Sequence, residues 1–153
     1  MKRMIAFFVV FLVLIVVQSL KTDDFKVFAG YEKVVVVCDE KYLDLDDNPI
    51  ISGNDFYHCI SGEKASHFFK NIKSYKYKGL SFYFDKSYSI EDFNKLFNNT
   101  LMASAIKGEY TIYYGYYEDF KDFRMIDGKR INVQLADVED NWIVGMPLIL
   151  TGF

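Results

Sequence analysis

The chain has 153 residues, 51% of them apolar and 25% charged, which is typical of one globular domain and disfavours a disordered chain. Its formal net charge is -3, and without Lys2 and Arg3 there remain 16 basic and 21 acidic residues. A nucleic-acid-binding protein needs a basic face to neutralise phosphates, so this interspersed, acidic charge disfavours nucleic acid as a partner.

The N-terminus has the layout of a secretory signal: Lys2 and Arg3 precede an apolar run over residues 4–17. Ser19 is a small residue at a suitable place for cleavage. An uncleaved anchor over residues 4–20 is the alternative, because about 17 apolar residues approach the length that spans a bilayer. Both interpretations place the rest of the chain outside the cytoplasm, since positive charge stays inside. A buried N-terminal helix would need enclosure on all sides by a small domain.

We therefore expect residues 1–20 to be a signal peptide or signal anchor, residues 21–31 a linker, and residues 32–153 one folded domain. Within that domain, the β-branched run at residues 34–38 is too short for a helix and predicts a buried strand. Residues 44–54 collect Asp, Asn, Pro and Gly, which predicts a loop. A second strand is predicted at residues 56–60.

Two helices are predicted from apolar residues spaced three and four apart. The first follows Ser61, its expected cap, and its apolar stripe is Ala65, Phe68, Phe69 and Ile72. The second begins at Ser89, a capping residue followed by two acidic ones, and is expected to continue to Lys107 before Gly108 ends it.

The remaining segments predict strands at residues 80–84, 109–117, 130–137 and 142–150. Asp127-Gly128 predicts a tight turn between two of them. The order of elements predicts an α+β fold, in which two helices cover one face of a mainly antiparallel sheet.

Two C-terminal segments resemble the closing motif of the YwmB-like family, exported proteins of spore-forming Gram-positive bacteria. They are Arg130-Ile-Asn-Val-Gln-Leu-Ala136 and Ile143-Val-Gly-Met-Pro-Leu-Ile-Leu-Thr-Gly-Phe153. Upstream, Tyr110-Thr-Ile-Tyr-Tyr114 and Glu118-Asp119-Phe120 are similar to the family's strand and acidic-aromatic turn. The resemblance mainly covers residues 80–153.

The resemblance implies a curved antiparallel sheet backed by helices, similar to the TATA-box-binding protein, in an exported or membrane-anchored cell-envelope protein. Family members are longer, so it implies an incomplete version of the two-lobed saddle. It implies no catalytic residue and no cofactor, and the fold's name describes shape only. An incomplete saddle leaves a sheet edge open, which a second copy would cover in a homodimer.

The two cysteines, Cys38 and Cys59, lie on predicted strands of a domain expected in an oxidising compartment. A disulfide between them would close a loop of about 20 residues and stabilise the fold by roughly 3 kcal/mol. Two buried free thiols are the alternative.

Metal sites are not expected. Asp44, Asp46, Asn48 and Asp55 imitate a calcium loop, but Pro49 occupies the position that needs Gly, so a solvated turn is favoured. The spacing of His58, Cys59 and His67 fits no closed tetrahedral zinc site.

The chain lacks the common motifs of nucleophilic, metal-dependent and phosphate-binding enzymes. The first hypothesis is therefore a non-enzymatic module that binds an envelope protein, peptide or glycan through the exposed face of its sheet. The predicted binding residues are the outward-facing Asn132 and Gln134, and Tyr113 in the tyrosine-rich strand. The alternatives are an enzyme using Asp46, Asp47 or Asp55 of the 44–55 loop, and a structural homodimer.

Overall fold

The computed structural model describes residues 29–107, 110–118 and 120–151, and within these ranges the chain has an α+β fold. The helices are α2 (Gly62–Lys70) and α3 (Ile90–Leu96), with a short 3-10 turn, η2 (Ile72–Ser74), after α2. The strands are β1 (Lys33–Cys38), β2 (Ile50–Ser52), β3 (Asp55–Ile60), β4 (Tyr77–Phe84), β5 (Met102–Lys107), β6 (Tyr110–Gly115), β7 (Arg124–Ile126), β8 (Lys129–Ile131), β9 (Val133–Asp137) and β10 (Trp142–Met146).

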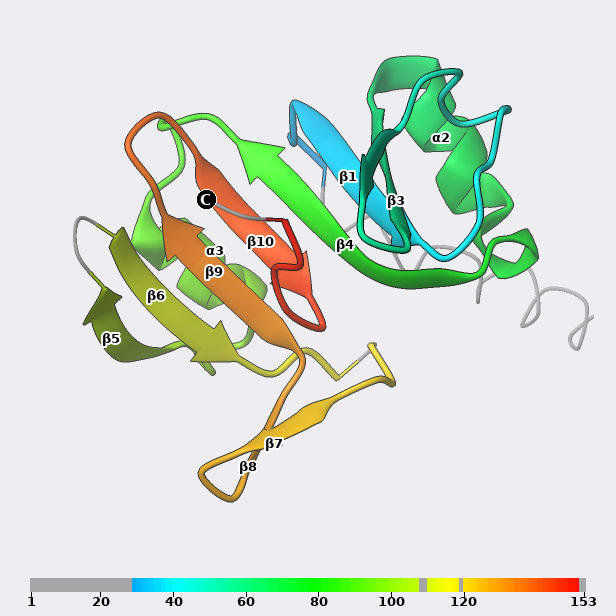
Figure 1. Ribbon diagram of the computed structural model, residues 1–153. Coiled ribbons are helices and arrows are strands. Elements are labelled where there is room, and N and C mark those ends of the chain that lie inside the picture. The colour runs from blue at the N-terminus through cyan, green and yellow to red at the C-terminus, as the bar shows by residue number, and fades with distance from the viewer. Residues whose placement is uncertain (1–28, 108–109, 119, 152–153) are drawn as a thin grey trace, which may run out of the picture.

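Most of the strands form one antiparallel sheet, in the order β2-β3-β1-β4-β10-β9-β6-β5. The long strand β4 lies in the middle of the sheet and is visibly bent (Figure 1). β7 and β8 pair with each other in a separate two-stranded ribbon. The predicted α+β class with a mainly antiparallel sheet and two helices is therefore confirmed.

Both helices cover the same face of the sheet because of the handedness of the connections. β3, β4 and β5 run in one direction, and the chain moves from β3 through β4 to β5 toward one edge. Crossovers between parallel strands are right-handed in nearly all proteins, so two successive crossovers in one direction place both helices on one side. Phe68 of α2 and Phe93 of α3 accordingly belong to one buried cluster.

The hydrophobic core lies between these helices and the sheet. Phe82 and Phe84 of β4 point into this core. Ser81 and Tyr83, which alternate with them along the strand, face the opposite side of the sheet. The rings of Phe84 and Phe93 meet edge to face, with centroids 5.3 Å apart. Such a pair contributes about 0.5–1.5 kcal/mol beyond its buried area, so the aromatic residues fix the helices to the sheet.

The first predicted helix is confirmed as α2. Ala65 and Phe68 are buried, as the apolar stripe predicts. Ser61 occupies the cap position with extended backbone, but its side chain makes no capping hydrogen bond.

The start of the second predicted helix is confirmed by a capping box at α3. The backbone N–H of Asp92 donates to Ser89 Oγ at 3.3 Å, and the backbone N–H of Ser89 donates to Asp92 Oδ2 at 2.9 Å. Two backbone donors at the start of the helix are bonded to side chains in this way.

The predicted end of this helix at Lys107 is wrong, because α3 ends at Leu96. Asn98 and Asn99 take positive φ angles of 52° and 58°. Asn tolerates this left-handed conformation better than most residues, and it terminates a helix. Residues 102–107 form β5 instead.

The turn at Asp127-Gly128 is confirmed, and both residues have positive φ angles, 48° and 74°. Two such residues form the turn that best matches the twist of a hairpin. The strand predicted at residues 130–137 is divided at Asn132 into β8 and β9, and the last strand ends at Met146 rather than residue 150.

The hydrophobic helix predicted within residues 1–20, and most of the predicted linker, lie outside the described residues. Among the described residues, no helix has the length and apolar character needed to cross a membrane. Tyr31, the last residue of the predicted linker, packs edge to face on Phe82 with ring centroids 5.4 Å apart. The folded domain therefore includes this residue.

His58 of β3 is fully buried on the helix side of the sheet. The backbone N–H of Tyr42 donates to its Nε2 at 3.3 Å, and within the described residues its Nδ1 has no hydrogen-bond partner. Burial lowers the pKa of His58, and the carbonyl of Glu40 with the nearby carboxylates of Asp46 and Asp44 only partly opposes this effect. The folded protein therefore holds a neutral imidazole.

We expect the wild-type chain to lose stability more steeply than His58→Gln as the pH falls from about 7.5 to about 5.5. Below about 6.5 the unfolded chain binds a proton at His58 while the folded chain does not, which costs up to about 1.4 kcal/mol per pH unit until the lowered pKa is reached. Gln can still accept from Tyr42. Urea unfolding followed by Trp142 fluorescence measures both variants, and parallel pH curves would contradict a neutral buried His58.

Candidate functional site

The face of the sheet opposite the helices, the open face, is crossed at its centre by residues 147–151, the C-terminal strap. After Met146 the chain folds back over β10 (Figure 1). The backbone N–H of Ile149 donates to Oε1 of Gln134 on β9 at 2.9 Å. The hydroxyl of Tyr83 on β4 donates to Oγ1 of Thr151 at 3.2 Å. The strap is thus tied to strands on both sides of β10.

Two glycines provide the space that the strap occupies. A Cβ atom on Gly145 would overlap the backbone N of Ile149 and the carbonyl carbon of Leu148. A Cβ atom on Gly79 would lie 2.8 Å from Cδ1 of Leu150. Only a residue without a side chain permits so close an approach of two backbones, so the glycine of the terminal motif has a packing role.

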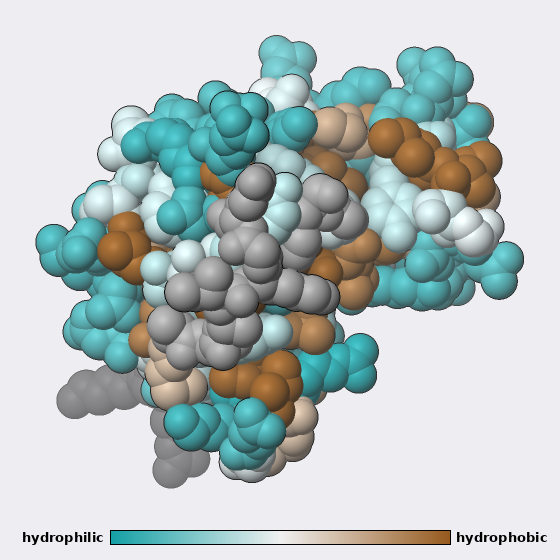
Figure 2. Space-filling view, turned by 60° about the vertical axis from the view of Figure 1, so that its left-hand side comes forward, coloured by the Kyte–Doolittle hydropathy of each residue, from teal (hydrophilic) through white to brown (hydrophobic). Residues whose placement is uncertain are grey.

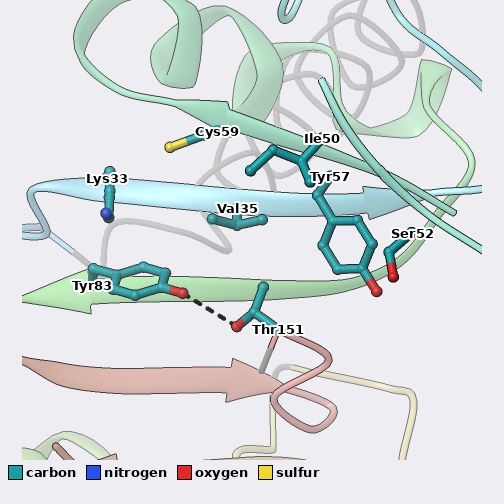
Figure 3. A pocket seen from close by; sticks show the side chains of 8 residues that line it. All are labelled: Lys33, Val35, Ile50, Ser52, Tyr57, Cys59, Tyr83 and Thr151. Carbon is teal, nitrogen blue, oxygen red and sulfur yellow. Dashed lines mark hydrogen bonds between the residues drawn. The ribbon is translucent and has the colours of Figure 1, made fainter. Parts of the chain in front are cut away.

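Beside the strap, the open face is hollowed into a groove of about 370 Å³. Its walls come from four strands and the strap, and its lining residues are Lys33, Val35, Ile50, Ser52, Tyr57, Cys59, Tyr83 and Thr151. Figure 3 shows the rings of Tyr57 and Tyr83 on either side of Val35. This volume lies in the range of sites that hold small ligands or single side chains.

The groove combines apolar walls with one positive charge. Nζ of Lys33 lies 4.6 Å from the centroid of the Tyr83 ring, a favourable cation–π contact. Among the lining residues that the structure describes, Lys33 is the one with a charged side chain. The groove is therefore suited to a neutral or anionic ligand and unsuited to a cationic one.

Asn132, predicted to face outward, is fully buried. Its Oδ1 accepts from the backbone N–H of Tyr117 at 2.6 Å, and its Nδ2 donates to the carbonyls of Tyr117 at 2.7 Å and Phe120 at 2.6 Å. The predicted outward orientation is wrong because the backbone groups of Tyr117 and Phe120 lie against this side chain. Asn132 holds the loop that leads from β6 to β7.

Gln134 lies on the open face, as predicted, but its side chain is engaged by the strap through Ile149. Tyr113 points to the helix side and packs against the core. Neither residue lines the groove, and the structure does not bring the predicted set of Asn132, Gln134 and Tyr113 together.

The other tyrosines of β6, Tyr110 and Tyr114, face the open side because each lies an odd number of residues from Tyr113 along the strand. Tyr114 is paired with Gln134, and Tyr110 lies on the same face four residues earlier on the strand. Both are half-buried. β9 and β10 separate them from the strands that line the groove, so they belong to a different part of the sheet.

Cys38 and Cys59 are free thiols, and the predicted disulfide is not formed between them. Cys59 pairs with Val35, three residues before Cys38 on the same strand, so the two side chains point to opposite faces. Cys38 is buried in the core and Cys59 is exposed in the groove. Burial, with Asp39 and Glu40 nearby, raises the pKa of Cys38 to about 12, which keeps it protonated.

Three carboxylates of the 44–55 loop, those of Asp44, Asp46 and Asp55, have separate structural partners, while Asp47 is exposed. Asp44 Oδ2 accepts from the hydroxyl of Tyr75 at 2.5 Å, and Asp46 accepts from the backbone two residues later at 3.0 Å. Asp55 lies 2.6 Å from Nζ of Lys78. None of these acids lines the groove, and the loop itself contains the short strand β2.

His58, Cys59 and His67 do not converge. His58 and Cys59 are successive strand residues and face opposite sides of the sheet, while His67 on α2 lies 3.8 Å from Asp44. Within the part of the chain that the structure describes, no three His, Cys, Asp or Glu side chains are placed to hold a metal ion.

Sequence reasoning did not identify Lys33, Tyr57 and Tyr83 as site residues. The sequence pattern that could have indicated them is alternation, because each is polar or aromatic and is adjacent to a buried residue on its strand. The pairing that brings three separate strands together is non-local, and the sequence pattern does not specify it.

No protein-family model matches the chain, and comparisons with curated proteins and with solved structures find no significant similarity.

We expect Asn132→Ala to destabilise the chain by about 3 kcal/mol, because the Tyr117 N–H and the Phe120 carbonyl each lose a buried bond at about 1–3 kcal/mol, while the Tyr117 carbonyl keeps the Phe120 N–H. Asn141→Ala is the matched control, since Asn141 Nδ2 makes a 3.3 Å bond to the Phe84 carbonyl, and we expect a loss of about 1 kcal/mol. Urea denaturation measures both. A loss at Asn132 no larger than at Asn141 would contradict its structural role.

Proposed function

We propose that this chain is a non-enzymatic, extracytoplasmic binding module, and that its groove takes an apolar segment of a partner carrying a carboxylate. The observation that carries the proposal is the groove itself, with the rings of Tyr57 and Tyr83 beside Val35 and the cation of Lys33 at its rim. Pockets of this kind fix a ligand by apolar contact and orient it by a few polar groups.

The apolar walls favour a peptide segment over a glycan. Val35, Ile50 and the two tyrosine rings offer little to satisfy the many hydroxyls of a sugar. An aliphatic or aromatic side chain would lose its contact with water there, and a neighbouring carboxylate would reach Lys33.

The sheet edge beside the groove extends this surface. β2 is an edge strand, and Ile50 and Ile51 expose 70% and 64% of their surface. Large apolar side chains left exposed on an edge strand are a common feature of partner-binding surfaces. A peptide lying along β2 would place alternate side chains toward the groove.

The extracytoplasmic location is supported by Lys2, Arg3 and the apolar residues 4–17, whether they form a cleaved signal or an anchor. The terminal motif at residues 143–153 supports assignment to the YwmB-like family, with a sheet similar to that of the TATA-box-binding protein in an incomplete form. The absence of enzymatic activity is proposed because Asp44, Asp46 and Asp55 of the 44–55 loop have structural partners and no acid of this loop lines the groove.

Display of a random heptapeptide library against the full chain tests the proposal, with counter-selection on the double variant Lys33→Glu/Tyr57→Ala. We expect enriched peptides to combine an apolar residue with Asp or Glu, and to bind Lys33→Glu at least about tenfold more weakly, a change of about 1.4 kcal/mol. Lys64→Glu on the exposed side of α2 is the matched charge control and should bind normally. Equal selection by wild type and double variant, or an enriched basic motif, would overturn the proposal.

A further inference from the structure

A two-stranded ribbon projects from the body of the molecule beyond the sheet. It comprises residues 121–131, the arm, with β7 paired to β8 through the turn at Asp127-Gly128. Figure 1 shows it at the lower end of the molecule, outside the main sheet. Residues 121–125 and 127–130 are exposed, Ile126 is half-buried and Ile131 is buried at the base, so most of the arm is open to solvent.

One face of the arm carries exposed apolar side chains together with a cation. Phe123 exposes 42% and Met125 60% of their surface. Met125 is paired with Arg130, whose guanidinium carbon lies 4.9 Å from the centroid of the Phe123 ring. The cation and the apolar surface are therefore held on the same face. Apolar atoms flanked by hydrophilic residues are visible at the lower end of Figure 2.

The charge of the arm is opposite to that of the rest of the chain. The arm has four basic residues, Lys121, Arg124, Lys129 and Arg130, against Asp122 and Asp127. The remaining residues of the chain have 14 basic against 19 acidic side chains, and Glu118 lies at the base of the arm. Repulsion between an anionic surface and the acidic body would orient the molecule with its arm toward that surface.

We propose that the arm is a contact site for an anionic lipid surface, with Phe123 and Met125 entering the headgroup region and Arg130 beside them binding a phosphate, while Arg124 and Lys129 on the other face of the ribbon add positive charge. Apolar side chains with flanking basic residues are the chemistry of interfacial membrane binding. A narrow, convex ribbon suits a deformable lipid surface better than a protein, because a stable protein interface buries about 800 Å² on each partner. This site is separate from the groove and does not depend on the proposed function.

A fluorescent label at the arm tests the proposal in the full chain. Cys59→Ser removes the exposed thiol, and Met125→Cys is then labelled with an environment-sensitive NBD probe while Cys38 stays buried. Leu43→Cys, at another site exposed by 63%, is the matched control. Both proteins are mixed with phosphatidylcholine vesicles with and without phosphatidylglycerol, and quenching by spin-labelled lipid is measured. The apolar residues 4–17 are present in every sample.

We expect the label at residue 125 to be quenched at least about fivefold more with phosphatidylglycerol than without it, and this difference to disappear in about 0.5 M salt or in Arg124→Glu/Arg130→Glu. The label at residue 43 should show no such difference. Equal quenching at both positions would overturn the proposal. Quenching at residue 125 that is the same with and without phosphatidylglycerol would overturn it too. A change at residue 125 that needs no lipid and grows with protein concentration would assign the arm to a second copy instead and also overturn it.

Discussion

The contact between the backbone of Ile149 and the bare Cα of Gly145 determines what the open face of this sheet can do. With both helices on one side, the opposite face of β4 and β10 has to be covered by another part of the chain or left to water. The strap covers it because Gly145 and Gly79 lack side chains and Gln134 accepts the Ile149 amide. The end of the strap then brings Thr151 to Tyr83, so the covering segment also forms one wall of the groove.

This arrangement separates two surfaces of different chemistry. The groove lies over β1 to β4, with Val35 between the rings of Tyr57 and Tyr83. The arm extends from the loop that Asn132 anchors, so a buried amide in the core sets the base of an exposed, basic ribbon. We infer that a partner segment and a lipid surface would contact the molecule at different places, which permits both contacts in one complex.

Local chemistry allowed part of the fold to be predicted. The capping box at Ser89 and the turn at Asp127-Gly128 are short-range arrangements, in which residues a few positions apart satisfy one another, and both were predicted. The end of α3 was not, because the apolar stripe continues past Asn98 while the backbone conformation there ends the helix.

The site residues were harder to predict because their roles depend on non-local pairing. Asn132 has the strand position of an exposed residue, and it is buried because the backbone groups of Tyr117 and Phe120 lie against it. The face assignments of Cys38 and Cys59 depend on the register, which pairs Cys59 with Val35 and Cys38 with Phe56 and so leaves the two thiols on opposite faces without a disulfide. The groove depends on the strap. The reversal of the chain after Met146 could not be predicted, because neither a helical nor a strand periodicity of apolar residues indicates it.

Hydrogen exchange at the amide of Ile149 tests most directly whether the strap is fixed on the sheet. This amide donates to the side chain of Gln134 on β9, and that bond would be lost if the C-terminal residues were detached from the sheet. If the strap lies on the open face as described, this amide exchanges at least about 100-fold more slowly than in an unstructured peptide. It should lose that protection in Gln134→Ala while the amides of β4 keep theirs. Exchange of the Ile149 amide at the unstructured rate in the wild-type chain would contradict a strap fixed on the sheet, and with it the wall of the groove.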